Sequence, residues 1–143
     1  MYKHILIPTD GSELSKRAIE YGVALAKEMK AKVTGITASM PYYTFTTDPE
    51  IFPQDLYRSS TISFANKCLN DLKSVAMNSG VPCNTIHMED IQPYQAIIDA
   101  AKHEGCDLIV MASHGRHGMS AVVLGSETVK VLTHSTVPVL VYR

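Results

Sequence analysis

The sequence has little cysteine, no tryptophan and no long apolar run. Its cysteines, Cys68, Cys83 and Cys106, stand far apart without a C-x-x-C pair. We therefore expect buried, reduced thiols rather than a disulfide framework or a zinc site. No stretch approaches the roughly 20 apolar residues of a membrane span, and the first apolar stretch is too short for a signal peptide. The sequence predicts a cytoplasmic protein without a membrane partner.

An excess of charge is also lacking. Thirteen basic and fourteen acidic residues give a formal net charge of -1, so nothing predicts a nucleic-acid partner through bulk charge. Neither the Walker pattern nor G-x-G-x-x-G after the first strand occurs, which argues against a P-loop motor and a dinucleotide enzyme. With 143 residues, the chain fits one domain, 1–143, that can bury its own core.

Hydrophobic periodicity predicts strands that alternate with helices. Strands are expected at 4–8, 32–38, 83–88, 107–112 and 137–142, and Pro138 restricts the last one to an edge or to a start at the proline. Helices are expected after the N-cap Ser12, from about 56 to 79, from Pro93 to about 103, and from 126 to 134. This alternation indicates an α/β fold, a single doubly wound domain with helices on both faces of a five-stranded parallel sheet.

Some expectations concern single positions. The spacing predicts that the first helix buries one face, made of Leu14, Ala18, Tyr21, Gly22, Leu25 and Met29. The second predicted helix would bury Leu56, Phe64, Cys68, Leu72, Val75 and Ala76. Gly35, inside a predicted strand, marks either a weak point or a place where something packs closely. His4, His87, His103 and His134 are expected at strand edges or on the surface.

The stretch from Met111 to Thr128 has the layout of a phosphate-binding loop. It follows an apolar strand, carries Gly115, Gly118 and Gly125, and ends where a helix begins. Glycine lets backbone N–H groups approach an anion, and the unpaired N–H groups of a helix N-terminus carry partial positive charge. The alternative is that these glycines only make turns.

The turn after the first strand, Pro8-Thr9-Asp10-Gly11, should lie beside this loop. In parallel sheets, ligands bind beyond the carboxyl ends of the strands, where the strand order reverses. Asp10 can accept hydrogen bonds from ribose hydroxyls but would repel phosphate, which places it at the sugar end. Asp10 could equally cap the first helix or shape the turn with Gly11.

At the other end of the loop, Gly125 and Ser126 offer donors to phosphate. Glu127 would have to point away from bound phosphates or help to hold a metal ion. Arg116 and His117 could supply positive charge over a phosphate tail.

With these motifs the chain resembles the universal stress protein family over essentially its whole length. The nucleotide-binding branch of that family carries glycine, two residues, glycine, nine residues, then glycine with serine or threonine. Gly115, the nine residues 116–124 and Gly125-Ser126 fit the last two parts. The first glycine falls on Ala112, where this sequence departs from the pattern.

The resemblance implies a strand order of 3-2-1-4-5 in an adenine nucleotide alpha hydrolase-like fold, an ATP site, and a homodimer formed through strand 138–142. Carried over by position, Asp10 would meet the ribose with Pro8 and Thr9 beside it, and the backbone near Ala38 would meet the adenine. Met111 and Ala112 would lie under the nucleoside. The phosphates would be held by Gly115, Gly125, Ser126 and Thr128.

The leading hypothesis is an ATP-binding stress-response switch with at most slow hydrolysis, since no general base or nucleophile is evident. Mg²⁺ would then be held by phosphate oxygens, Ser126 or Thr128. Ala112 supports a rival, a dimeric scaffold that binds no nucleotide. A third and weaker reading is a ligase-type pyrophosphatase domain that uses the Thr9-Asp10-Gly11-Ser12 turn. Metal binding by His114 and His117 is disfavoured because no third ligand has sensible spacing.

Overall fold

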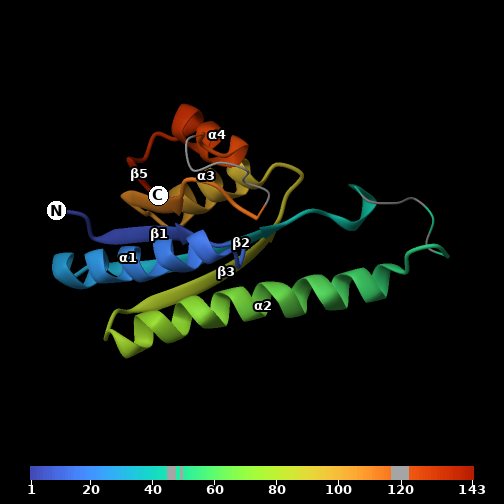
Figure 1. Ribbon diagram of the computed structural model, residues 1–143, viewed down its shortest axis with the longest axis horizontal. Helices are drawn as coiled ribbons and strands as arrows, with labels where there is room; N and C mark the ends of the chain where they lie inside the picture. Colours follow the sequence, from blue (N-terminus) through green and yellow to red (C-terminus); the bar gives the residue numbers. More distant parts are fainter. Residues whose placement is uncertain (45–47, 49, 117–122) are drawn as a thin grey trace.

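A computed structural model describes residues 1–44, 48, 50–116 and 123–143, and it shows a single parallel sheet between two layers of helices (Figure 1). The strand order is β3-β2-β1-β4-β5, as predicted. In chain order the elements are β1 (His4–Pro8), α1 (Glu13–Met29), β2 (Lys32–Ser39), the 3-10 helix η1 (Tyr42–Thr44), α2 (Gln54–Asn78), β3 (Cys83–Glu89), α3 (Pro93–His103), β4 (Leu108–Ala112), α4 (Ser126–His134) and β5 (Val139–Tyr142).

Two cores hold the layers together, one on each face of the sheet. Ile5 and Ile7 of β1 pack in the core covered by α1 and α2. Leu6, between them, packs in the other core with Ile97 of α3 and Val131 of α4. All three β1 side chains have no exposed surface, because successive side chains of a strand point to opposite faces and both faces of this sheet are covered.

The start of β1 is fixed by two polar contacts. The N–H groups of Lys3 and His4 donate to the Asp107 carboxylate at 2.8 and 3.0 Å. His4 Nε2 lies 2.7 Å from Thr34 Oγ1 in the interior. The expectation of an edge or surface position was therefore wrong for His4, which is 5% exposed. Its hydrogen bond explains how the fold accepts a polar ring there.

The buried face of α1 also differs from the predicted one. It consists of Ser15, Ala18, Ile19, Gly22, Val23 and Ala26, whereas Tyr21 is 43% exposed. A Cβ on Gly22 would lie 2.7 Å from Ile7 Cδ1, so the helix approaches the sheet too closely for a large side chain on that face. Tyr21 instead packs against Tyr142, with ring centroids 5.5 Å apart.

The long helix α2 covers β2 and extends beyond the ends of the strands (Figure 1). A Cβ on Gly35 would lie 2.7 Å from Leu72 Cδ1, which explains the strand glycine by close packing. Leu56 is 58% and Phe64 39% exposed, so both were wrongly assigned to the buried face, because this part of α2 has less sheet to cover. None of the helices in the described ranges has the length and apolar character needed to cross a bilayer.

The buried His4 predicts a pH dependence of stability. Burial, followed by the charge of Lys32, lowers the pKa of His4 from its ordinary value of 6.5. The unfolded chain therefore takes up a proton at a higher pH than the folded chain, and stability falls as the pH drops through that value. We expect a lower urea midpoint at about pH 5.5 than at about pH 7.5, and a smaller difference in His4→Gln, which keeps a hydrogen-bonding group.

The matched control is His103→Gln, since His103 is exposed at the end of α3. It should keep the wild-type difference between the two pH values. An unchanged difference in His4→Gln would contradict this account.

Candidate functional site

The turn that follows β1 is held by its own side chains. Asp10 Oδ1 accepts a hydrogen bond from the Ser12 N–H at 3.0 Å. Ser12 in turn caps α1, because its hydroxyl accepts from the Ser15 N–H at 3.2 Å. Gly11 between them has a φ of +80°, a conformation that favours glycine. The turn thus begins α1 and aims the other Asp10 oxygen away from the helix.

That second oxygen joins the turn to the loop after β4. Asp10 Oδ2 accepts from the Arg116 N–H at 2.9 Å, and Arg116 Nε donates to the Asp10 carbonyl oxygen at 2.9 Å. A Cβ on Gly115 would lie 2.4 Å from Asp10 Oδ2, so the glycine is required for this approach. The prediction that the two loops are neighbours is confirmed.

These contacts also set the charge of Asp10. Burial alone would raise the pKa of its carboxyl group, but hydrogen bonds from Ser12 and from the Arg116 N–H outweigh burial and hold the pKa below its ordinary value of 3.8. Asp10 is therefore an ionised acceptor at neutral pH. Arg116 is held on its other side by Phe64, whose ring centroid lies 4.0 Å from the guanidinium carbon.

The N-terminus of α4 forms the opposite side of the site. The Gly125 N–H, predicted as a phosphate donor, already donates to the Ser113 carbonyl oxygen at 2.7 Å. No side chain caps this helix, and the described residues give no partner to the N–H groups of Ser126, Glu127 and Thr128. These three backbone donors are the anion-binding groups that the helix offers.

Two side chains of α4 serve the fold. Glu127 Oε2 accepts from the Tyr94 N–H at 2.9 Å, at the start of α3, and Glu127 Oε1 lies 3.1 Å from Lys130 Nζ. Thr128 Oγ1 donates to the Ala112 carbonyl oxygen at 3.0 Å. Glu127 thus caps α3, and Thr128 ties α4 to the end of β4, so Thr128 offers a ligand its backbone rather than its hydroxyl.

Beyond the end of β1, the backbone of β2 is open. The last paired residues are Pro8 and Ile36, and the Thr9 N–H donates to the Ile36 carbonyl oxygen at 2.9 Å. Backbone groups of a strand alternate in direction, so Ala38 turns its N–H and C=O to the same side as Ile36. There the described residues offer it no strand partner. Ala38 therefore presents a donor and an acceptor at the point where the sheet divides.

A cleft of about 510 Å³ connects these features. It brings together every residue predicted for the site, namely Pro8, Thr9, Asp10, Ala38, Met111, Ala112, Gly115, Arg116, Gly125, Ser126, Glu127 and Thr128.

Sequence reasoning missed nine further lining residues: Ser15, Ile36, Thr37, Ser39, Met40, Phe64, Pro93, Ile97 and His114. Those at the end of β2 could have been found from the rule that strand ends meet at one edge. Nothing local in the sequence indicates Phe64, which arrives from α2. His117 and Gly118 lie outside the described residues.

The cleft has two chemically different ends. Ile36 and Met40, at the end of β2, and Ile97, in the same core as Ile36, make one end apolar. The other end, beyond β4, carries the N-terminus of α4, and Asp10, Arg116 and Phe64 lie between the two ends. A cavity with an apolar end and a donor-rich end fits a ligand that joins a flat apolar group to an anion.

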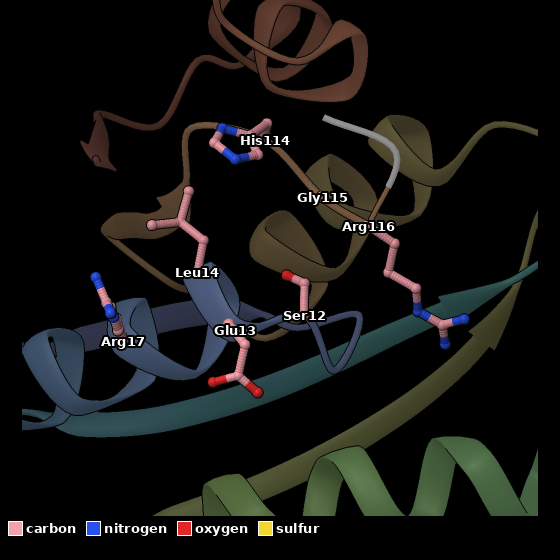
Figure 2. Close-up of a pocket in the computed structure, with 7 residues that line it drawn as sticks. All are labelled: Ser12, Glu13, Leu14, Arg17, His114, Gly115 and Arg116. Atoms are coloured by element: carbon pink, nitrogen blue, oxygen red, sulfur yellow. The ribbon is translucent and has the colours of Figure 1, made fainter. Parts of the chain in front are cut away.

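A smaller hollow of about 330 Å³ lies beside the cleft, where the start of α1 faces the loop after β4. Figure 2 shows Leu14 pointing toward His114, while Arg17 and Arg116 lie at opposite sides and Glu13 points away from the hollow. The cationic groups do not converge here, in contrast to the donors at α4.

Comparison with known proteins agrees with this architecture. The family model described as the universal stress protein family matches residues 1–143. The universal stress protein YxiE of Bacillus subtilis is 32% identical, and the alignment covers all of both chains. The solved structure of MJ0577, a universal stress protein of Methanocaldococcus jannaschii, is 31% identical, covers 99% of this chain and 96% of its own, and has a TM-score of 0.84.

Two further solved structures share the fold at lower identity. One is a universal stress protein in complex with cAMP, 23% identical with a TM-score of 0.74, covering 99% of this chain and 97% of its own. The other is the universal stress protein of Archaeoglobus fulgidus in complex with dAMP, 19% identical with a TM-score of 0.72, covering 99% and 98%. By its sequence over the whole length and by its strand order, this chain belongs to the universal stress protein family.

Proposed function

We propose that this protein binds ATP in the 510 Å³ cleft and acts in the cytoplasm as a nucleotide-dependent switch in the stress response. One observation carries the proposal: the cleft joins an apolar end to the N–H groups of Ser126, Glu127 and Thr128, which have no partner among the described residues. Helix N-termini bind phosphate through such groups. The adenine nucleotides in two proteins of the same fold, cAMP and dAMP, support this ligand class.

The two ends support one direction for the nucleotide. The base lies by Ile36, Met40 and Ile97, and the phosphates meet the start of α4. Asp10, between these ends, accepts from the ribose hydroxyls, since an ionised carboxylate repels phosphate but has lone pairs to spare for hydroxyl donors.

The site favours binding over rapid hydrolysis. Asp10 is engaged by two backbone N–H groups, and Glu127 is engaged by the Tyr94 N–H and Lys130. A general base needs a lone pair aimed at an attacking water. In this proposal the remaining lone pairs of Asp10 face the ribose, and both oxygens of Glu127 are engaged within the fold. We infer at most slow ATP hydrolysis. Mg²⁺ would be held by phosphate oxygens and the Ser126 hydroxyl, because the Thr128 hydroxyl donates to Ala112.

One feature favours a second function, that of a dimeric scaffold without nucleotide. Ala112 places a methyl group in the cleft wall where the nucleotide-binding pattern has glycine, and this residue is 8% exposed. A methyl group there narrows the space under the nucleoside. The ATP titration described below separates the two functions.

The proposed assembly is a homodimer formed through β5. This strand lies at one edge of the sheet, and all four of its residues are half-buried. Pro138 and Tyr142 direct their carbonyl oxygens toward β4, so Val139 and Val141 turn their backbone groups outward. Unpaired edges are usually covered in natural proteins, and a second copy of β5 would cover this one.

The test of nucleotide binding is a titration with ATP by calorimetry, after removal of any co-purified nucleotide. Ser126→Pro is the sharpest variant, because it deletes one N–H donor together with the Ser126 hydroxyl, at a position where helices accept proline. Gly125 before it has φ -62° and ψ 152°, an extended conformation that proline tolerates in its neighbour. We expect ATP affinity to fall about tenfold or more, since hydrogen bonds to charged groups are strong.

The matched control is Glu13→Pro, at the first position of α1 after Ser12, which is also extended with φ -66° and ψ 158°. Its affinity for ATP should stay at the wild-type value. No heat and no thermal shift with millimolar ATP in the wild-type protein would sink the proposal and favour the scaffold. Replacing Gly125 is a poorer test, since a Cβ there would lie 3.0 Å from His114 Cα whether or not a ligand binds.

Val141→Pro tests the assembly, because it removes an outward N–H from β5 without touching the ladder to β4. Sedimentation should show a dimer for the wild type and for Val141→Thr, which keeps the N–H, and a monomer for Val141→Pro. A wild-type monomer at micromolar concentration would count against the dimer.

A further inference from the structure

The apolar end of the cleft contains one side chain with a hydroxyl group free of the backbone. Thr37 Oγ1 donates to the Thr9 carbonyl oxygen at 3.0 Å, so its proton is used. Ser39, the last residue of β2, also lines the cleft. Ile36 and Met40, near the same end of β2, also line the cleft. A polar group among apolar ones in a binding cleft usually fixes the orientation of a ligand.

Ser39 has a partner behind it on the next strand. Its Oγ lies 2.8 Å from His87 Nε2. The register pairs His87 with Thr37 and Glu89 with Ser39, so His87 and Ser39 are diagonal neighbours on one face of the sheet. His87 is half-buried and does not line the cleft. Both residues stand on strands of the same sheet, which holds their separation fixed.

The pair gives the hydroxyl a direction. A serine hydroxyl alone rotates and can donate or accept. When its proton is donated to an imidazole nitrogen, the remaining lone pairs of the oxygen are available only to a donor on the ligand. Beside it, Ala38 turns a backbone N–H and C=O toward the gap left by β1. With His87 Nε2 as the acceptor, this end of the cleft carries a fixed set of polar groups rather than an adaptable one.

We propose that Ser39 is a specificity-determining residue that accepts a hydrogen bond from the exocyclic amino group of the nucleotide's base. His87 is the positioning residue, because its Nε2 accepts the hydrogen bond that the Ser39 hydroxyl donates. The pair then prefers a 6-amino purine to a 6-keto purine, which presents a carbonyl oxygen at the same place. This inference rests on the proposed function and names the part of the ligand that the site distinguishes.

The experiment measures the affinities of ATP, ITP and inorganic tripolyphosphate by calorimetry. ITP differs from ATP at the 6-position and at N1 of the base, and tripolyphosphate has no base. The variants are Ser39→Ala, His87→Ala, both together, and His87→Gln, whose amide can replace the ring nitrogen. Thr85→Ala is the control, because Thr85 is an exposed residue of the same strand. Thermal unfolding verifies that each variant is folded.

For Ser39→Ala we expect ATP affinity to fall about three- to tenfold, the range of a neutral hydrogen bond, while ITP and tripolyphosphate change by less than about twofold. His87→Ala should act in the same direction, the double variant should be no weaker than Ser39→Ala, and His87→Gln should recover part of the loss. A double variant whose loss of ATP affinity is smaller than the sum of the two single losses shows that His87 acts through Ser39.

Equal losses for ATP and ITP in Ser39→Ala, or no loss, would overturn the inference. Additive losses in the double variant would remove the role of His87. Wild-type protein that binds ATP and ITP equally well overturns this inference and leaves the proposed function standing, whereas wild-type protein that binds no ATP overturns both.

Discussion

The site depends on the carboxylate of Asp10, which joins two loops that are more than one hundred residues apart in the chain. One oxygen accepts from Ser12 and fixes the start of α1, and the other accepts from the Arg116 N–H and fixes the loop after β4. Gly115 lies so close to this carboxylate that a Cβ would collide with it. The same group that shapes the cleft is the one that we propose meets the ribose.

The sheet explains why this contact forms. β1 is the central strand, and β2 and β4 lie on either side of it. β2 continues past the end of β1, so the turn with Asp10, the open backbone of Ala38 and the loop after β4 surround one gap. Thr128 and Glu127 then fix α4 against β4 and α3. The Glu127 carboxylate, which would repel a phosphate, and the Thr128 hydroxyl thus hold α4 in place. The backbone N–H groups at the start of this helix would bind the phosphate.

Much of this could be predicted from the sequence. Alternating strands and helices define the fold class, and the strand-end rule gathers Asp10, Ala38 and the 111–128 loop at one edge. The side-chain assignments that failed depend on distances that a sequence does not contain. Gly22 brings α1 so close to β1 that the buried face excludes Tyr21.

Other details depended on the tertiary arrangement as well. The Gly125 N–H has a partner because Ser113 lies opposite it. Glu127 points to α3 because the start of that helix, whose own N-cap residue Gln92 makes no side-chain cap, lies within reach. The pairing of His4 with Thr34, like that of Ser39 with His87, follows from the strand register. Each of these required two segments to be placed in space before the chemistry could be assigned.

The central claim is that one cleft holds a nucleotide with its base at Ala38 and its phosphates at the start of α4. Amide chemical shifts recorded by NMR during an ATP titration test it most directly. The account predicts the largest changes at the amides of Ala38, Gly115, Ser126 and Glu127. No change in the amide chemical shifts, or changes that concentrate at the far end of α2 near Asn78, would contradict it.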